Sequence, residues 1–159
     1  MLLGGCSAGT LGAPGDALRA NATVVRVVDG DTLVADTGGV EERVRLIGID
    51  TPESVDASRP VMCFGDEASR ALADLLPGGT PVLLVRDTEP RDRYGRLLAY
   101  VYRAADGRFV NLDLVRAGYA DAYPYPPNEH HSAELRRAAA AARAEGAGAW
   151  SACPHPFEE

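Results

Sequence analysis

The segment Arg45 to Glu53, with the sequence R-L-I-G-I-D-T-P-E, brings together groups that can act on a phosphate. A guanidinium such as that of Arg45 can pair with phosphate oxygens through two parallel hydrogen bonds. Asp50 can bind a hard divalent cation, and Glu53 can take a proton from a nearby water. The segment therefore predicts a metal ion and a catalytic base beside a phosphodiester.

Asp31 is the second carboxylate that such a metal site needs. It opens a strand predicted over 31–35, although aspartate is depleted in strands. Asp50 directly follows the strand predicted over 41–49, and antiparallel pairing of these neighbours brings the two residues together. Two carboxylates, a backbone carbonyl and waters form an oxygen-only site suited to Ca²⁺ or Mg²⁺. On spacing alone, ordinary turn and strand-end residues are the commoner explanation of two such aspartates.

Further candidates for substrate contact lie later in the chain. Arg96 in Y-G-R can neutralise charge that develops on a phosphoryl group, although a solvated strand arginine is the simpler explanation of either Arg45 or Arg96 alone. Tyr123 and Tyr125, in the extended segment Y-P-Y-P-P, can stack on a nucleic-acid base or pack against the surface.

The order of elements predicts an α+β fold. Turn signals separate five predicted strands, and three predicted helices have apolar residues at helical spacing. The strands are expected over 21–28, 31–35, 41–49, 82–85 and 96–102, and the helices over 64–76, 109–117 and about 128–145, with Asn128 as a possible N-cap. This order favours a five-stranded OB-fold-like β-barrel with about three packed helices. His130 and His131 are expected to be solvated.

The composition fits one soluble globular domain with tails. The 159 residues include 16 basic side chains, all arginine, and 23 acidic ones, so the formal net charge is 16 − 23 = −7. This balance argues against nucleic-acid binding through bulk electrostatics, although a local basic cluster remains compatible with it. No apolar run approaches the roughly 20 residues of a membrane span.

The three cysteines allow two predictions. Cys6 ends M-L-L-G-G-C, which is similar to the lipid-attachment box of bacterial lipoproteins, and residues 1–20 have the composition of a flexible tether. The basic region and longer apolar core of a signal are missing, so either the start is truncated or the similarity is accidental. Cys63 and Cys153 can form a disulfide in an oxidising compartment, or they are two buried thiols. Their spacing does not suggest a zinc site.

Four motifs together resemble the thermonuclease, or staphylococcal-nuclease-like, family in order and spacing. The resemblance covers roughly residues 21–151, and four motifs are far more specific than one. They are V-D-G-D-T at 28–32, R-L-I-G-I-D-T-P-E at 45–53, D-R-Y-G-R at 92–96 and Y-P-Y-P-P-N at 123–128.

The resemblance implies an OB-fold nuclease that uses Ca²⁺ to hydrolyse DNA and RNA on the 5′-oxygen side, leaving 3′-phosphates. The implied metal ligands are the carboxylates of Asp31 and Asp50 with the carbonyl of Thr51. Glu53 is similar in position to the residue that acts in this family as the general base or positions the attacking water. The implied phosphate clamps are Arg45 and Arg96, and the implied nucleotide contacts are Arg93, Tyr94, Tyr123 and Tyr125. Arg93 stands where the best-known member has a lysine, so the charge is kept.

We therefore expect residues 21–152 to form a metal-dependent endonuclease, with 153–159 as a tail. The expected protein is a monomer, secreted or tethered outside a bacterial membrane by lipid at Cys6, with no protein partner. Single-stranded or frayed nucleic acid should be preferred because stacking needs an exposed base. The alternatives are a catalytically silent OB-fold module that binds nucleic acid, and an envelope lipoprotein whose domain only holds a metal.

Overall fold

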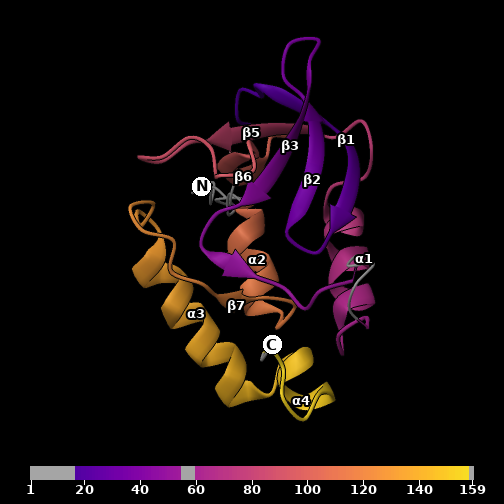
Figure 1. Ribbon diagram of the computed structural model, residues 1–159, viewed down its shortest axis with the longest axis vertical. Helices are drawn as coiled ribbons and strands as arrows, with labels where there is room; N and C mark the ends of the chain where they lie inside the picture. The colour runs from indigo at the N-terminus through magenta and orange to yellow at the C-terminus, as the bar shows by residue number, and fades with distance from the viewer. Residues whose placement is uncertain (1–16, 55–59, 158–159) are drawn as a thin grey trace, which may run out of the picture.

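The computed structural model describes residues 17–54 and 60–157. Cys6 and the expected lipid attachment lie outside the described residues. Within them, a β-barrel is stacked on a layer of helices (Figure 1). The strands are β1 (Ala22–Asp29), β2 (Thr32–Asp36), β3 (Glu41–Leu46), β4 (Ile49–Asp50), β5 (Pro81–Val85), β6 (Leu97–Arg103) and β7 (Asp121–Ala122).

The barrel closes in the order β1-β2-β3-β6-β5, which confirms the predicted five-stranded OB-fold-like architecture. Neighbouring strands pair antiparallel except β3 and β6, where Val44 lies opposite Leu97 in parallel register. β5 returns to β1, with Val82 opposite Ala22. Inward side chains such as Leu33 and Val44 are fully buried, so the barrel encloses an apolar core.

The third strand differs from the prediction of one strand over 41–49. β3 ends at Leu46, and Ile49–Asp50 forms a separate short strand that pairs with β7. Gly48 lies between them at φ 78°, a left-handed conformation that glycine adopts without a Cβ penalty. The apolar alternation also fails after Leu46. The turn redirects the chain so that Asp50 comes to lie beside Arg45.

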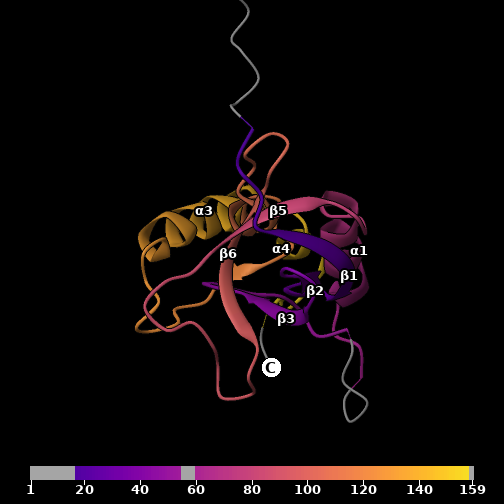
Figure 2. The same ribbon diagram turned by 90° about the horizontal axis from the view of Figure 1, so that it is seen from above.

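In the described part of the chain, three helices form the second layer, as predicted, and a short fourth helix follows them near the C-terminus. They are α1 (Gly65–Leu75), α2 (Val110–Arg116), α3 (Ser132–Glu145) and α4 (Ala149–Ala152). α2 lies between α1 and α3, which occupy opposite sides of the molecule (Figures 1 and 2). None of the described helices is long and apolar enough to cross a membrane.

The start of α3 was predicted wrongly at Asn128. The helix begins at Ser132, and His131 occupies the N-cap position. Asn128 is buried because its amide pairs with both the N–H and the carbonyl of Glu89. His131 is not solvated as expected, since its ring contacts Tyr100 and bonds the Tyr102 hydroxyl and the Glu134 carboxylate.

A disulfide joins Cys63, just before α1, to Cys153, just after α4. The two cysteines are 90 residues apart in sequence. A cross-link across so long a loop removes many conformations from the unfolded chain. The disulfide therefore ties the C-terminal helices to the first helix.

Removing this disulfide should destabilise the fold. Cys63→Ser with Cys153→Ser is expected to lower the free energy of unfolding by about 4 kcal/mol in the loop-entropy model. Urea titration monitored by far-UV circular dichroism measures the change. Dithiothreitol should produce the same loss in the wild type and none in the double variant. Alkylation of both Cys63 and Cys153 in unreduced wild-type protein, located by peptide mass analysis, would contradict the disulfide.

Candidate active site

A pocket of about 360 Å³ lies where the β1–β2 turn, β3, β4 and the loop before β6 meet. Its wall carries most of the residues that the sequence singled out. They are Asp31, Arg45, Asp50, Thr51, Glu53, Tyr94 and Arg96, and they are joined by Asp29, Pro52, Met62 and Phe157. Side chains from positions 29 to 157 thus share one cavity.

The β1–β2 turn holds Asp31 against Thr51. The carboxylate oxygen Oδ2 of Asp31 accepts hydrogen bonds from the backbone N–H (3.2 Å) and the hydroxyl (3.1 Å) of Thr51. Gly30 makes this approach possible, since a Cβ there would lie 2.7 Å from the Thr51 hydroxyl oxygen. Asp31 is only 7% exposed. Its position is therefore fixed by packing as well as by hydrogen bonds.

Arg45 connects the two aspartates. Its Nη2 lies 3.1 Å from Asp31 Oδ2 and 3.0 Å from Asp50 Oδ1. Its Nη1 donates to the carbonyls of Leu46 and Ile49, both at 2.9 Å. Arg45 is therefore not the solvated strand residue that its position alone suggested. It spans the turn between β3 and β4 and holds Asp50 in the pocket.

Arg96 is placed by Asp92, a residue that the sequence analysis did not single out. One Asp92 oxygen accepts the Arg96 Nε–H at 2.6 Å, and the other accepts the backbone N–H groups of Tyr94 and Arg96. Burial alone would raise the pKa of Asp92, but these hydrogen bonds and the arginine charge hold that pKa below its usual value. The anionic carboxylate therefore organises the turn that carries Arg96.

The predicted nucleotide contacts divide into two groups. Tyr94 is 68% exposed at the pocket rim, and Arg93 lies over its ring and donates to its hydroxyl. Tyr123 is 53% exposed and lines a hollow that adjoins the pocket at Asp50. Tyr125 is not brought to the pocket. It packs against a buried cluster of Ile47, Leu98 and Tyr100.

Asp29 is a pocket residue that was not among the predicted site residues. Burial and the neighbouring negative charge of Asp31 raise its pKa to about 7. The signal that could have found it is the D-G-D spacing, because a tight turn between two strands places both aspartates at the same end of the barrel. Asp29 also accepts the backbone N–H of Asp31.

The donor set of this pocket fits a hard cation. The Asp31 and Asp50 oxygens converge on a single Arg45 nitrogen, and Asp29 and Glu53 add further carboxylates. Among the described residues, no three acidic, histidine or cysteine side chains are close enough to hold an ion alone. Oxygen ligands of this kind suit a hard divalent cation whose coordination backbone carbonyls and water can complete.

Known proteins resemble this chain over most of its length. The family model "Staphylococcal nuclease homologue" matches residues 43–152. "Thermonuclease" of Staphylococcus intermedius is 42% identical over 127 residues, which is 80% of this chain and 74% of that protein. "Thermonuclease" of Staphylococcus hyicus is 38% identical over 128 residues, with the same two coverages of 80% and 74%. "Endonuclease YncB" of Bacillus subtilis is 36% identical over 132 residues, covering 82% of this chain and 62% of that protein.

The chain belongs to the staphylococcal nuclease homologue family. This confirms the resemblance that the four motifs indicated. The stretch matched by the family model contains Arg45, Asp50, Glu53 and Arg96, whereas Asp31 lies before it. In this family member, the buried contacts of Asp31 with Thr51 and Arg45 place it in the same pocket as the matched residues.

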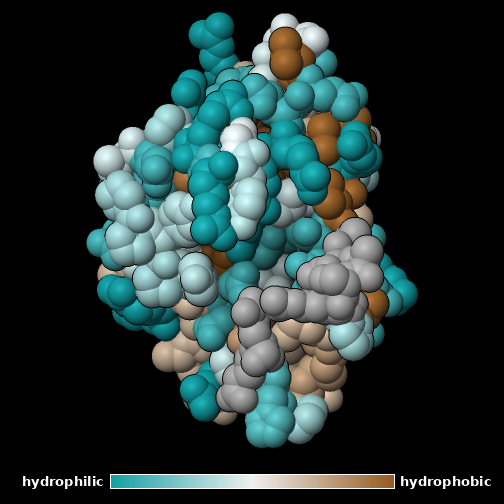
Figure 3. Space-filling view, in the orientation of Figure 1, coloured by the Kyte–Doolittle hydropathy of each residue, from teal (hydrophilic) through white to brown (hydrophobic). Residues whose placement is uncertain are grey.

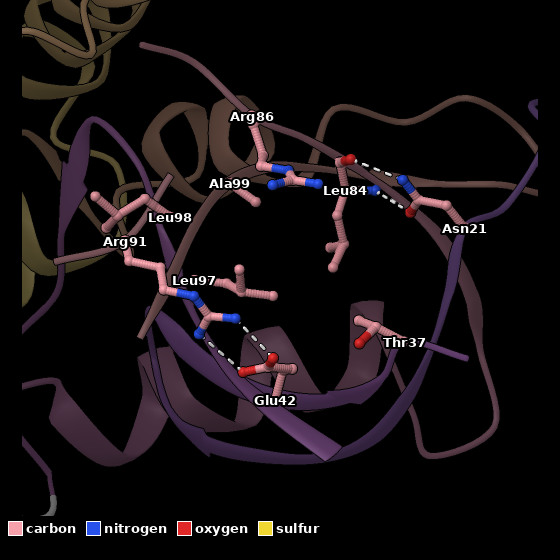
Figure 4. Close-up of a pocket in the computed structure, with 9 residues that line it drawn as sticks. All are labelled: Asn21, Thr37, Glu42, Leu84, Arg86, Arg91, Leu97, Leu98 and Ala99. Carbon is pink, nitrogen blue, oxygen red and sulfur yellow. Dashed lines mark hydrogen bonds and ion pairs between the residues drawn. The ribbon is translucent and has the colours of Figure 1, made fainter. Parts of the chain in front are cut away.

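A second hollow, of about 390 Å³, lies at the opposite end of the barrel strands (Figure 4). Asn21 precedes β1 there and bonds the backbone of Leu84. Arg91 forms a two-point ion pair with Glu42 and also donates to the carbonyl of Gly95. The ion pair therefore anchors β3 to the turn that presents Tyr94 and Arg96 to the active-site pocket.

Replacing Asp92 should loosen the turn that carries Arg96. Asp92→Asn is expected to lower the free energy of unfolding at pH 7 by about 1–3 kcal/mol, because three N–H donors lose a charged acceptor. The folded-state pKa of Asp92 is lowered, so its contribution is present above the ordinary carboxyl value of 3.8 and is lost as the pH falls through the folded value.

Denaturant titrations of wild type and Asp92→Asn at pH 7 and pH 3 test this direction of the pH dependence of stability. The difference between Asp92→Asn and wild type should be larger at pH 7. Asp74→Asn, on the exposed side of α1, is a matched control that should change stability little at either pH. An Asp92→Asn protein as stable as wild type at pH 7 contradicts the assignment.

Proposed function

We propose that this member of the nuclease family is a Ca²⁺-dependent nuclease that hydrolyses DNA and RNA on the 5′-oxygen side and leaves 3′-phosphates. The observation that carries the proposal is the convergence of Asp31 and Asp50 on the Arg45 guanidinium, in a pocket that also contains Glu53 and Arg96. A bound cation, a proton acceptor and positive charge on the phosphoryl oxygens each accelerate hydrolysis of a phosphodiester. The pocket holds groups suited to all three.

Asp31, Asp50 and the backbone carbonyl of Thr51 are the residues that would hold the ion. When bound, Ca²⁺ supplies Lewis-acid polarisation of a phosphate oxygen. The hydrogen bonds from Thr51 keep the Asp31 carboxylate in a fixed orientation, so little rearrangement is needed on binding. The side chain of Asp50 is 39% exposed, which leaves it open to the cavity.

Glu53 is the proposed base. It follows Pro52 in the loop between β4 and α1, and it lines the pocket. Its backbone carbonyl accepts the N–H of Met62, which fixes the main chain at this position. A carboxylate so placed can orient water and accept its proton as the water attacks phosphorus in line.

Arg45 and Arg96 stabilise the charge that develops on the phosphoryl oxygens. Both are already oriented by carboxylates, Arg45 by Asp31 and Asp50, and Arg96 by Asp92. A guanidinium that is oriented before the reaction loses less side-chain entropy when it binds phosphate. Among the described residues, the Arg96 side chain bonds Asp92 through Nε, and its terminal nitrogens have no carboxylate partner there, so they can turn to a phosphate.

Tyr94 and Tyr123 are the proposed base contacts, and Arg93 supports the Tyr94 ring. Both tyrosines are largely exposed beside the pocket. Stacking on them needs an unpaired base, so we propose that single-stranded or frayed nucleic acid is preferred. Tyr125 is omitted from this role because it does not line the pocket and is partly buried against Ile47, Leu98 and Tyr100.

The proposal extends to a monomeric, extracytoplasmic protein. The Cys63–Cys153 disulfide supports an oxidising compartment, where such bonds persist. On the face drawn in Figure 3, hydrophilic side chains cover most of the described area, and apolar ones are scattered or in small groups. That pattern gives no support for a large apolar interface on this face.

Nuclease activity should require the cation. Purified protein with heat-denatured DNA and Ca²⁺ is expected to release acid-soluble nucleotides, and a chelator should stop the release because Asp31 and Asp50 then lack their ion. A parallel reaction with RNA tests the sugar preference, and loss of the terminal phosphate to a phosphatase specific for 3′-phosphates identifies 3′-phosphate ends. If no chelator-sensitive release occurs, the proposal of a Ca²⁺-dependent nuclease is wrong.

Glu53→Gln should lower kcat by about 10²–10⁴-fold, the usual contribution of a general base. Binding of a labelled single-stranded oligonucleotide, measured by fluorescence anisotropy, should change little because the amide keeps the shape of the side chain. Glu67→Gln, on the exposed first turn of α1, is the control and should retain wild-type kcat. Full activity in Glu53→Gln would exclude Glu53 as the base.

A further inference from the structure

Three hollows adjoin one another through shared lining residues, and the first of them is the active-site pocket. Asp50 and Phe157 line both the pocket and a hollow of about 210 Å³ beside Tyr123. Asp121 and Ala122 of β7 line both that hollow and a third one, of about 480 Å³, that runs along α3. We call the third hollow the α3 groove; its other wall is formed by Arg136, Ala139, Ala140, Arg143, Ala144 and Trp150.

The α3 groove has a basic and sterically open helix face. Arg136 and Arg143 are seven residues apart, which places them on the same side of the helix about 10 Å apart along its axis. Ala139 and Ala140 lie between them, and these short side chains leave room for a ligand close to the helix. An elongated anion can therefore contact both guanidinium groups at once.

The charges of α3 are sorted between two faces. Glu134 and Glu145 line a different groove together with Arg116 and Arg137. Neither Arg136 nor Arg143 forms an ion pair with an acidic side chain in the part of the chain that the structure describes. This face is thus locally basic in a protein whose formal net charge is −7.

Asp121 is the acidic side chain of the α3 groove. Burial raises its pKa, although a hydrogen bond from the Ala122 N–H and the charge of Arg143 oppose this shift. Arg143 also lies over the Trp150 ring, 5.3 Å from its centre. Arg143 is therefore partly committed to other groups, and Arg136 is the arginine with the greater freedom to bind an incoming anion.

We propose that the α3 groove binds the phosphates of a nucleic-acid strand beyond the nucleotides held in the active-site pocket. The inference rests on the proposed nuclease function and adds to it a subsite for substrates longer than a dinucleotide. Arg136 and Arg143 contact the phosphodiester backbone, and the strand passes Tyr123 on its way from the pocket. Backbone contacts of this kind raise affinity without reading sequence.

Arg136→Glu and Arg137→Glu provide a matched test. The two arginines are adjacent and the charge change is identical, but Arg137 lines the other groove. We expect Arg136→Glu to lower kcat/KM for a 20-nucleotide single-stranded DNA at least tenfold more than for a dinucleotide, mainly through KM. Arg137→Glu should lower the two values by similar, small factors. Equal effects of the two substitutions on this ratio would overturn the proposal.

The salt dependence of DNA binding affinity gives a second test of the phosphate contact. For single strands, each phosphate contact contributes about 0.7 to the slope of log affinity against log salt concentration. Arg136→Gln should therefore reduce that slope for the 20-nucleotide DNA by about 0.7. Arg137→Gln should leave the slope unchanged, and an unchanged slope in Arg136→Gln contradicts a phosphate contact.

Trp150 allows a binding test that needs no catalysis. It is the single tryptophan of the chain and it lines the α3 groove. With Ca²⁺ chelated, the 20-nucleotide DNA should change the tryptophan fluorescence of the wild type, and the dinucleotide should not. Arg136→Glu should weaken this response at least tenfold. If the wild type shows the fluorescence response but hydrolyses nothing, the proposed function fails and the α3 groove stands. If it hydrolyses DNA without the response, the proposed function stands and the α3 groove fails.

Discussion

The guanidinium of Arg45 is the connection on which the rest of the site depends. One of its nitrogens pairs with carboxylates from two separate segments, Asp31 in the β1–β2 turn and Asp50 in β4. The other satisfies two backbone carbonyls in the turn between β3 and β4. Arg45 is only 15% exposed, so removing it would leave charged and polar groups with less compensation in a poorly solvated place. The same contacts that stabilise the turn therefore set the spacing of the carboxylates.

The interruption of the third strand is what makes this arrangement possible. A continuous strand through Ile49 would carry Asp50 away from Arg45 along the barrel. The left-handed turn at Gly48 instead directs the chain into β4, which pairs with β7. That pairing has a second effect, because β7 leads directly into Tyr123 and forms one wall of the α3 groove. One local deviation from barrel geometry thus places both Asp50 beside Asp31 and one wall of the α3 groove.

The sequence predicted the barrel, the three main helices and the meeting of Asp31 with Asp50, because these follow from local turn signals and apolar periodicity. It could not predict features that depend on tertiary contacts. Asn128 has the sequence of an N-cap, but its pairing with Glu89 comes from a loop 39 residues away. Tyr123 and Tyr125 look equivalent in an extended segment, yet Tyr123 is exposed and Tyr125 is partly buried against the barrel. The role of Asp92 in orienting Arg96 could not be predicted, because its hydrogen bonds form only when the turn around it is folded.

The net charge of −7 is a poor guide to how this protein meets a polyanion. Screening limits the reach of exposed charges to about 8 Å at physiological ionic strength, so a strand responds to the groups beside it and not to the total. Beside the pocket, those groups have opposite signs. Asp29, Asp31, Asp50 and Glu53 crowd the reaction centre, whereas Arg136 and Arg143 lie along α3. Under the proposed function, a cation bound in the acidic centre favours entry of a phosphate there, while the α3 arginines attract the strand with or without the cation. Under that proposal, binding of the strand along α3 is independent of the metal, whereas entry of the scissile phosphate into the pocket depends on it.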